Sequence, residues 1–163
     1  MIEIDPTSRI SRLADIEDSV RGTRIVVGPM VVIDSFVKIK PVGGSGDVVI
    51  GERSYLNSGT VVYSGNGVTI GKGVLISANC TLAPVNHAFV RADLTIMEQE
   101  FQPSKGGIII EDDVWIGANS VVLDGATIRR GAVVAAGSVV HHELEAFGVY
   151  AGTPLRLVKK RNA

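Results

Sequence analysis

The stretch IEDDVWIGANSVVLDGATIRRGAVVAAGSVVHHEL, residues 110–144, decides the fold of this chain. Large aliphatic residues recur in it at strict intervals of six: Ile110, Ile116, Val122, Ile128, Val134 and Val140. Such a period fits neither an α-helix nor an alternating strand. It is typical of a β-solenoid whose coil has three flat sides, with one hexapeptide on each side.

Each large residue is followed four positions later by a second, mostly small one: Val114, Ser120, Ala126, Ala132, Ser138 and Leu144. Gly125, Gly131 and Gly137 precede members of this second set, where a corner would need positive φ. We expect both sets to share the narrow triangular interior. The same spacing occurs upstream at Ile50, Leu56, Val62, Ile70, Ile76 and Leu82, and more faintly at Ile10 and Ile16.

The places where the repeat stops predict the organisation of the chain. We expect a single domain, residues 1–163, with about seven coils stacked about 4.8 Å apart. The repeat disappears over residues 88–107 and resumes cleanly, which predicts a long loop pushed out from one corner and, by its length, a functional one. Residues 146–163 leave the pattern again, and Leu155–Asn162 has a helical composition, which predicts a short C-terminal helix.

Composition excludes several classes of function. The chain has 163 residues, a net charge of −1 and 5% aromatic residues, so it shows no electrostatic footprint for nucleic acid. It has no apolar run long enough to span a bilayer and no signal-peptide pattern at its N-terminus, so we expect no membrane insertion. Its one cysteine, Cys80, cannot form an internal disulfide, which favours a cytoplasmic location.

Histidine is scarce, and His87 has the most informative position of the three. It ends the hexad Leu82–His87, where the chain leaves the coil for the long loop. A group that titrates near neutral pH, on a rigid rim beneath a loop, suits a general base. The alternative is an ordinary surface histidine at a turn.

Several motifs together resemble the hexapeptide-repeat acyltransferases. They are Asn86-His87, the long loop, Asp113-Val114-Trp115-Ile116-Gly117, Ala136-Gly137-Ser138 and Gly152-Thr153-Pro154. Within that family the chain is most similar to the maltose/galactoside O-acetyltransferase-like branch, which includes sugar acetyltransferases of polysaccharide synthesis. The resemblance implies a left-handed parallel β-helix, a homotrimer and acetyl-CoA as co-substrate.

The resemblance also implies roles for individual residues. His87 matches the catalytic base, and Asn86 matches an asparagine that helps to place the acceptor. Trp115 matches a tryptophan near the thioester of CoA. Ala118 and Ala136 match positions whose backbone contacts the pantetheine arm of CoA. Arg156 and Lys159 match cations near the nucleotide end of CoA. Because the phosphates of CoA are anionic, they would bind these two cationic side chains.

Two further sites are predicted less directly. Glu98 and Gln99 are the loop residues that we favour for contacts with sugar hydroxyls. His141-His142 stands where the family often has Thr-Lys, so the resemblance does not carry over to this chain any phosphate contact made by that lysine. The two histidines are adjacent, and adjacent residues of a strand face opposite ways, so we expect no shared metal.

We therefore expect an acetyl-CoA-dependent O-acetyltransferase that acts on a sugar hydroxyl, with His87 as general base and no metal. An N-acetyltransferase acting on a nucleotide-linked amino sugar is the alternative. A γ-class carbonic anhydrase would need three converging histidines. An inactive scaffold would not explain why these motifs occur together. The sequence leaves open the acceptor sugar, O- versus N-transfer, the acyl chain length and the roles of His141 and His142.

Overall fold

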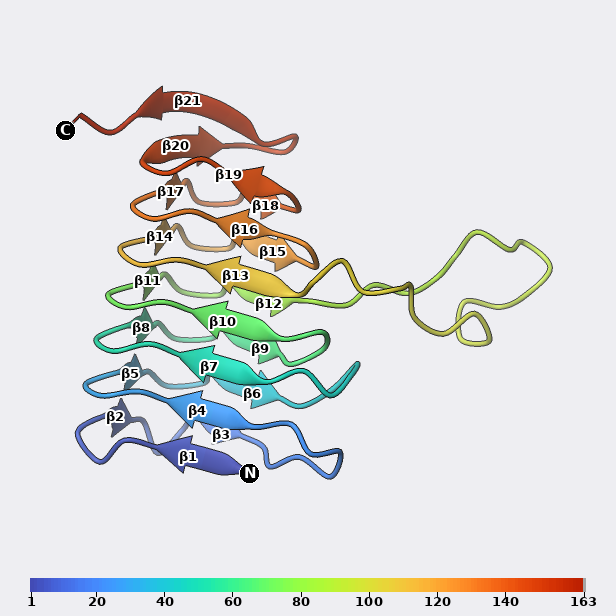
Figure 1. Ribbon diagram of the computed structural model, residues 1–163, viewed down its shortest axis with the longest axis horizontal. Coiled ribbons are helices and arrows are strands. Elements are labelled where there is room, and N and C mark those ends of the chain that lie inside the picture. The colour runs from blue at the N-terminus through green and yellow to red at the C-terminus, as the bar shows by residue number, and fades with distance from the viewer. Residues whose placement is uncertain (163) are drawn as a thin grey trace.

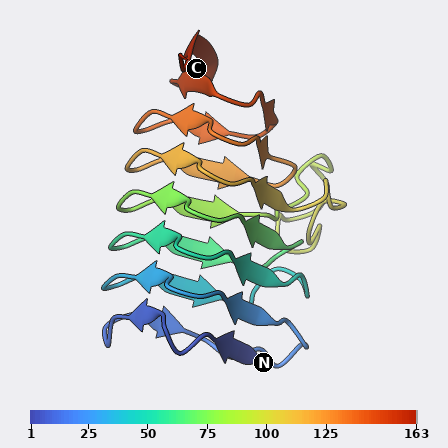
Figure 2. The ribbon, with the colours of Figure 1, turned by 60° about the vertical axis from the view of Figure 1, so that its left-hand side comes forward.

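A computed structural model describes residues 1–162, which form strands and turns and no helix. The chain winds upward as a coil with three flat sides, and each side contributes one strand per turn to a parallel sheet (Figures 1 and 2). The front strands of Figure 1 run leftward and the rear strands rightward as the chain rises, so the coil is left-handed. The predicted all-β, left-handed parallel β-helix is confirmed.

Each side of the coil is one sheet, named here A, B or C. Sheet A contains β1 (Ile2–Ile4), β4 (Ile25–Val27), β7 (Val48–Ile50), β10 (Val68–Ile70), β13 (Ile108–Ile110), β16 (Thr127–Ile128) and β19 (Glu143–Leu144). Sheet B contains β2 (Arg9–Ile10), β5 (Val32–Ile33), β8 (Tyr55–Leu56), β11 (Leu75–Ile76), β14 (Trp115–Ile116), β17 (Val133–Val134), β20 (Gly148–Ala151) and β21 (Arg156–Lys160). Sheet C contains β3 (Asp15–Ile16), β6 (Lys38–Lys40), β9 (Val61–Tyr63), β12 (Thr81–Ala83), β15 (Val121–Leu123) and β18 (Val139–Val140).

The hexad residues stack in register and make the core. In sheet A, Ile50, Ile70, Ile110 and Ile128 are successive partners, and each is at most 1% exposed. In sheet C, Leu82, Val122 and Val140 form an equivalent column and are fully buried. The small residues four positions on, such as Ala126 and Ala132, are buried beside them. The hexad pattern therefore gave the correct inward face for these coils.

Corners are held by tight backbone contacts. Gly125, Gly131 and Gly137 have φ values of 84°, 69° and 70°, as the pattern predicted. At Gly117 an added Cβ would lie 2.4 Å from the backbone N of Ala136 in the next coil. Only glycine permits two coils to approach this closely at that corner.

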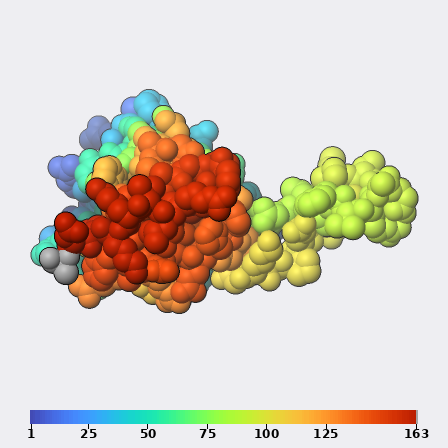
Figure 3. Space-filling model, turned by 90° about the horizontal axis from the view of Figure 1, so that it is seen from above, coloured from blue at the N-terminus to red at the C-terminus, as the bar shows by residue number. Residues whose placement is uncertain are grey.

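A long excursion leaves the coil between β12 and β13, over residues 84–107, slightly earlier than predicted. It projects far from the triangular body (Figures 1 and 3). Large apolar side chains on it remain open to solvent, among them Phe89 at 66%, Val90 at 84% and Met97 at 86% exposure.

The predicted C-terminal helix is wrong. Arg156–Lys160 is strand β21, which pairs antiparallel with β20 and closes the last edge of sheet B. A helix of so few residues is only marginally stable by itself, whereas the free edge of β20 offers backbone partners. Leu155, 8% exposed, covers the end of the core just before this strand.

No helix suited to crossing a membrane occurs in the described part of the chain. The triangular sections share one continuous hydrophobic core. A single domain over residues 1–163 stays a prediction, and Ala163 lies outside the described residues.

Candidate functional site

The two limbs of the excursion meet again at its base, and this contact positions Asn86 and His87. His87 and Phe101 form an isolated antiparallel bridge. Beside it, Gln102 N donates to Asn86 O at 2.8 Å, and Ala88 N donates to Glu100 O at 3.0 Å. The predicted coil-to-loop junction is therefore held by a short two-stranded neck.

The neck also fixes the His87 ring. Its Nδ1 lies 3.2 Å from the carbonyl oxygen of Glu100, and its centroid lies 4.7 Å from that of Phe101. A carbonyl oxygen can only accept, so this contact requires the proton on Nδ1. In the neutral ring Nε2 then carries the lone pair, as a general base requires.

An open pocket of about 440 Å³ lies at this junction, large enough for a small ligand. It is lined by Asn86, His87, Phe89, Gln102, Lys105, Leu123, Asp124 and His141. Sequence reasoning identified the first two and missed the others. The register of sheet C is the signal that could have found His141, because it follows Val140 as Leu123 follows Val122.

Asp124 is a buried carboxylate of this pocket, only 3% exposed. Its Oδ1 accepts from Gly107 N at 2.9 Å. Its Oδ2 accepts from Lys105 N at 2.8 Å and from Asn66 Nδ2 at 3.2 Å. Asp124 therefore ties the returning limb of the excursion to the coil.

Trp115 lies on a different side of the molecule, in β14 of sheet B. Its side chain is 49% exposed and its Nε1 donates to Ser77 Oγ at 3.1 Å. A second open pocket, also of about 440 Å³, is lined there by Gly73, Leu75, Asp113, Val114, Trp115, Val133 and Arg161. His87 is the predicted base, and Trp115 is predicted to lie near the thioester of CoA. Within one chain, these two residues line separate pockets.

Ala118 and Ala136 occupy equivalent positions on successive coils, at the corner between sheets B and C. Gly137 N donates to Ala118 O at 2.8 Å, which joins the two turns. Within residues 1–162, the amides of Ala118 and Ala136 donate to no protein acceptor.

Cations gather at the C-terminal end of the coil. Arg156 and Lys159 are exposed on β21. Sequence reasoning missed Arg161, whose Nη1 donates to Gly131 O at 2.8 Å and pairs with Asp113 at 3.1 Å, at the rim of the Trp115 pocket. The register of the unforeseen strand β21 decides which of these side chains reaches the coil.

Glu98 and Gln99 lie away from the His87 pocket, within the excursion. Glu98 accepts from Thr95 N and Oγ1, both at 2.8 Å, and these bonds hold its pKa below the usual value. The Gln99 side chain accepts from Arg91 N and donates to Leu94 O. Both side chains are engaged within the loop, and their contact with an acceptor stays a prediction.

Other reactive groups are few. Cys80 is fully buried, donates to Gly117 O at 3.3 Å, and burial raises the pKa of its thiol. The described residues contain no group of three or more His, Cys, Asp and Glu that could hold a metal ion.

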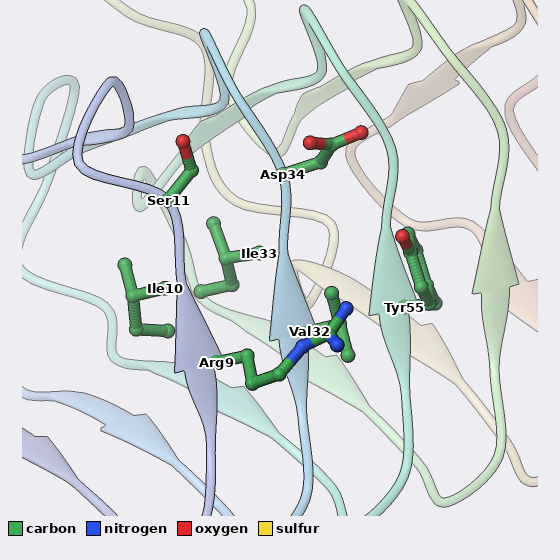
Figure 4. A pocket seen from close by; sticks show the side chains of 7 residues that line it. All are labelled: Arg9, Ile10, Ser11, Val32, Ile33, Asp34 and Tyr55. Atoms are coloured by element: carbon green, nitrogen blue, oxygen red, sulfur yellow. The ribbon is translucent and has the colours of Figure 1, made fainter.

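A smaller pocket of about 220 Å³ lies on sheet B near the N-terminus (Figure 4). Arg9, Val32 and Tyr55 form one wall as register partners on three neighbouring strands. Asp34, at its upper rim, accepts from Ser35 N and Ser58 Oγ. The carboxylate thus supports the turns of neighbouring coils, and none of the predicted site residues lines this pocket.

Comparison with known proteins agrees with the coiled fold. Residues 47–84 and 107–141 match the family model described as the hexapeptide repeat of succinyl-transferase. A mutant form of the N-acyltransferase AntD of Bacillus cereus, solved with dTDP-4-amino-4,6-dideoxyglucose and coenzyme A, matches with a TM-score of 0.79 and 26% identity over 94% of this chain and 80% of that one.

A hexapeptide-repeat acetyltransferase of Vibrio cholerae, solved with acetyl coenzyme A, matches at 29% identity and a TM-score of 0.61, over 87% of this chain and 70% of that one. These findings show that the chain is similar to hexapeptide-repeat acyltransferases. The maltose/galactoside O-acetyltransferase-like branch is not confirmed.

Among curated proteins, 2,3,4,5-tetrahydropyridine-2,6-dicarboxylate N-acetyltransferase of Staphylococcus aureus (strain MRSA252) is 40% identical over 92 residues, which are 56% of this chain. The matched stretch spans 33% of that relative's length. The names of the Staphylococcus relative and of AntD describe transfer to nitrogen, so they favour the amine alternative over the sugar hydroxyl that the sequence predicted.

Proposed function

We propose that this chain is an acyl-CoA-dependent N-acyltransferase, which moves an acetyl group from acetyl-CoA to the amino group of a small acceptor such as a nucleotide-linked amino sugar. One observation carries the proposal: the Nδ1 contact with Glu100 O leaves His87 Nε2 free to accept a proton beside an open pocket. The similarity to AntD, an N-acyltransferase solved with coenzyme A, supports acyl transfer as the reaction in which this base acts.

The reaction would proceed in one ternary complex. The neutral amine attacks the thioester carbonyl, a C–N bond forms, and the proton lost by the nitrogen goes to His87 Nε2. The C–S bond then breaks, and His87 returns the proton to the sulfur of CoA. Cys80 is buried as a thiol with a raised pKa, so no acyl-enzyme on this cysteine is needed or favoured.

The cofactor would lie in a groove between the three-sided coils of two copies of the chain. Trp115 would border the thioester, and the amides of Ala118 and Ala136 would bind the acyl oxygen and the pantetheine arm. Arg156 and Lys159 would contact the CoA phosphates. Because His87 and Trp115 lie in separate pockets of one chain, this arrangement requires a neighbouring copy, as in the predicted homotrimer.

The test is an acceptor screen with acetyl-CoA that detects release of free CoA thiol. It should pair amino sugars, free and nucleotide-linked, with hydroxyl sugars of matched structure. We expect acylation of an amino compound and loss of at least a hundredfold in rate in His87→Ala. Turnover confined to hydroxyl sugars would contradict N-transfer and restore the sequence-based prediction.

A further inference from the structure

The His87 pocket contains one cation without an ion-pair partner. Lys105 forms no salt bridge with any residue in 1–162, although its backbone N–H is bound by Asp124. Its stem lies against the coil, since a Cβ at Gly125 would come 3.5 Å from Lys105 Cδ. Lys105 is exposed, and the stem of its side chain passes Gly125 at the edge of the pocket.

His141 lines the same pocket from the coil above. It is exposed, its ring lies edge-on to that of His142 at 4.8 Å, and within residues 1–162 its ring makes no hydrogen bond. A histidine ring donates at least one N–H in either ionisation state. His142, the next residue, does not line the pocket.

The only carboxylate of the pocket is already satisfied. Three N–H donors, from Gly107, Lys105 and Asn66, occupy both oxygens of Asp124. Lys105 and His141 are thus the donors that remain open to a ligand, together with the amides of Asn86 and Gln102. This combination suits an anionic oxygen group.

We propose that Lys105 and His141 form a subsite for an anionic group of the acceptor, a carboxylate or a phosphate, beside the amine that His87 deprotonates. The proposal rests on the proposed function for calling the ligand an acceptor, but anion binding can be measured without turnover. The acceptor named for the Staphylococcus relative carries two carboxylates, and the sugar nucleotide bound to AntD carries a diphosphate.

Titration calorimetry on the whole chain at low salt, without CoA, tests the subsite. The probes are inorganic pyrophosphate and succinate. We expect one of them to bind, and Lys105→Met and His141→Ala each to weaken it about ten- to hundredfold, the range for contacts with charged groups. Lys105→Arg should keep most of the affinity, and circular dichroism should show all variants folded.

Lys72→Met and His142→Ala are the matched controls, because they remove the same groups outside the pocket. Preference for pyrophosphate identifies a phosphate-bearing ligand, and preference for succinate a carboxylate. No binding of either probe, or equal loss in the controls, overturns the subsite. His87→Ala should still bind the probe, so failure of catalysis and failure of the subsite give different results.

Discussion

Asp124 Oδ2 and the side-chain amide of Asn66 lie 3.2 Å apart, although 58 positions separate the two residues. The same carboxylate holds the backbone of Lys105 and Gly107, where the excursion returns to the coil. Asn66 comes from the coil below and Asp124 from the coil above. This contact therefore fixes the base of the excursion and, with it, one wall of the His87 pocket.

Asp124→Ala should release the returning limb, because it leaves three N–H groups without their acceptor. We expect the free energy of unfolding to fall by about 1–3 kcal/mol in chemical denaturation. Proteolysis within residues 88–107 should become faster. Asp93→Ala, which removes an exposed loop carboxylate paired with Arg91, is the control and should change stability little. Equal changes in stability and proteolysis in both variants would contradict the role of Asp124 in holding the returning limb.

His87→Ala should lower kcat by about 10²- to 10⁴-fold, because it removes the general base, while acetyl-CoA binding stays nearly intact. Stopped-assay rates measure kcat, and calorimetry with CoA measures binding. Near-wild-type kcat with a confirmed acceptor would place the base elsewhere.

Arg156→Ala and Lys159→Ala should raise the KM for acetyl-CoA about ten- to hundredfold, because contacts of charged groups with phosphate are lost. The KM for the acceptor should change far less. Arg53→Ala removes an exposed arginine elsewhere on the coil and is the control. An unchanged acetyl-CoA KM in the double variant would rule out this role.

A homotrimer is expected in solution from the family resemblance, and Phe89, Val90 and Met97, which are exposed on the excursion, offer apolar surface to a neighbouring copy. Sedimentation equilibrium at micromolar concentration measures the mass. Val90→Glu with Met97→Glu should weaken association if the excursion packs against a neighbour. A stable wild-type monomer would contradict the homotrimer, and with it the proposed CoA groove between two copies of the chain.

Ile128→Asp should destabilise the coil by several kcal/mol, because it places a charge among fully buried aliphatic side chains. Thr127→Asp, one position earlier on the outer face of β16, is the matched control and should cost much less. Thermal unfolding monitored by circular dichroism compares the two. Similar losses would mean that the inward face is misassigned.

The sequence by itself determined the coil. With one hexapeptide on each flat side, the residues at Ile110, Ile116 and Val122 must all turn inward, so strict spacing predicts the core directly. Gly125, Gly131 and Gly137 predicted the corners that follow Val122, Ile128 and Val134 for the same local reason. The exit of the chain after the hexad that ends at His87 is equally local, and it predicted the junction of coil and loop.

Only the tertiary structure decided what lies around that junction. His141 and Asp124 line the same pocket as His87 because particular coils stack in register, and the contact of His87 with Glu100 depends on how a long excursion closes. β21 became a strand because β20 offers a free edge, against the helical composition of its residues. These outcomes depend on contacts between distant segments, which the local spacing of a repeat does not encode.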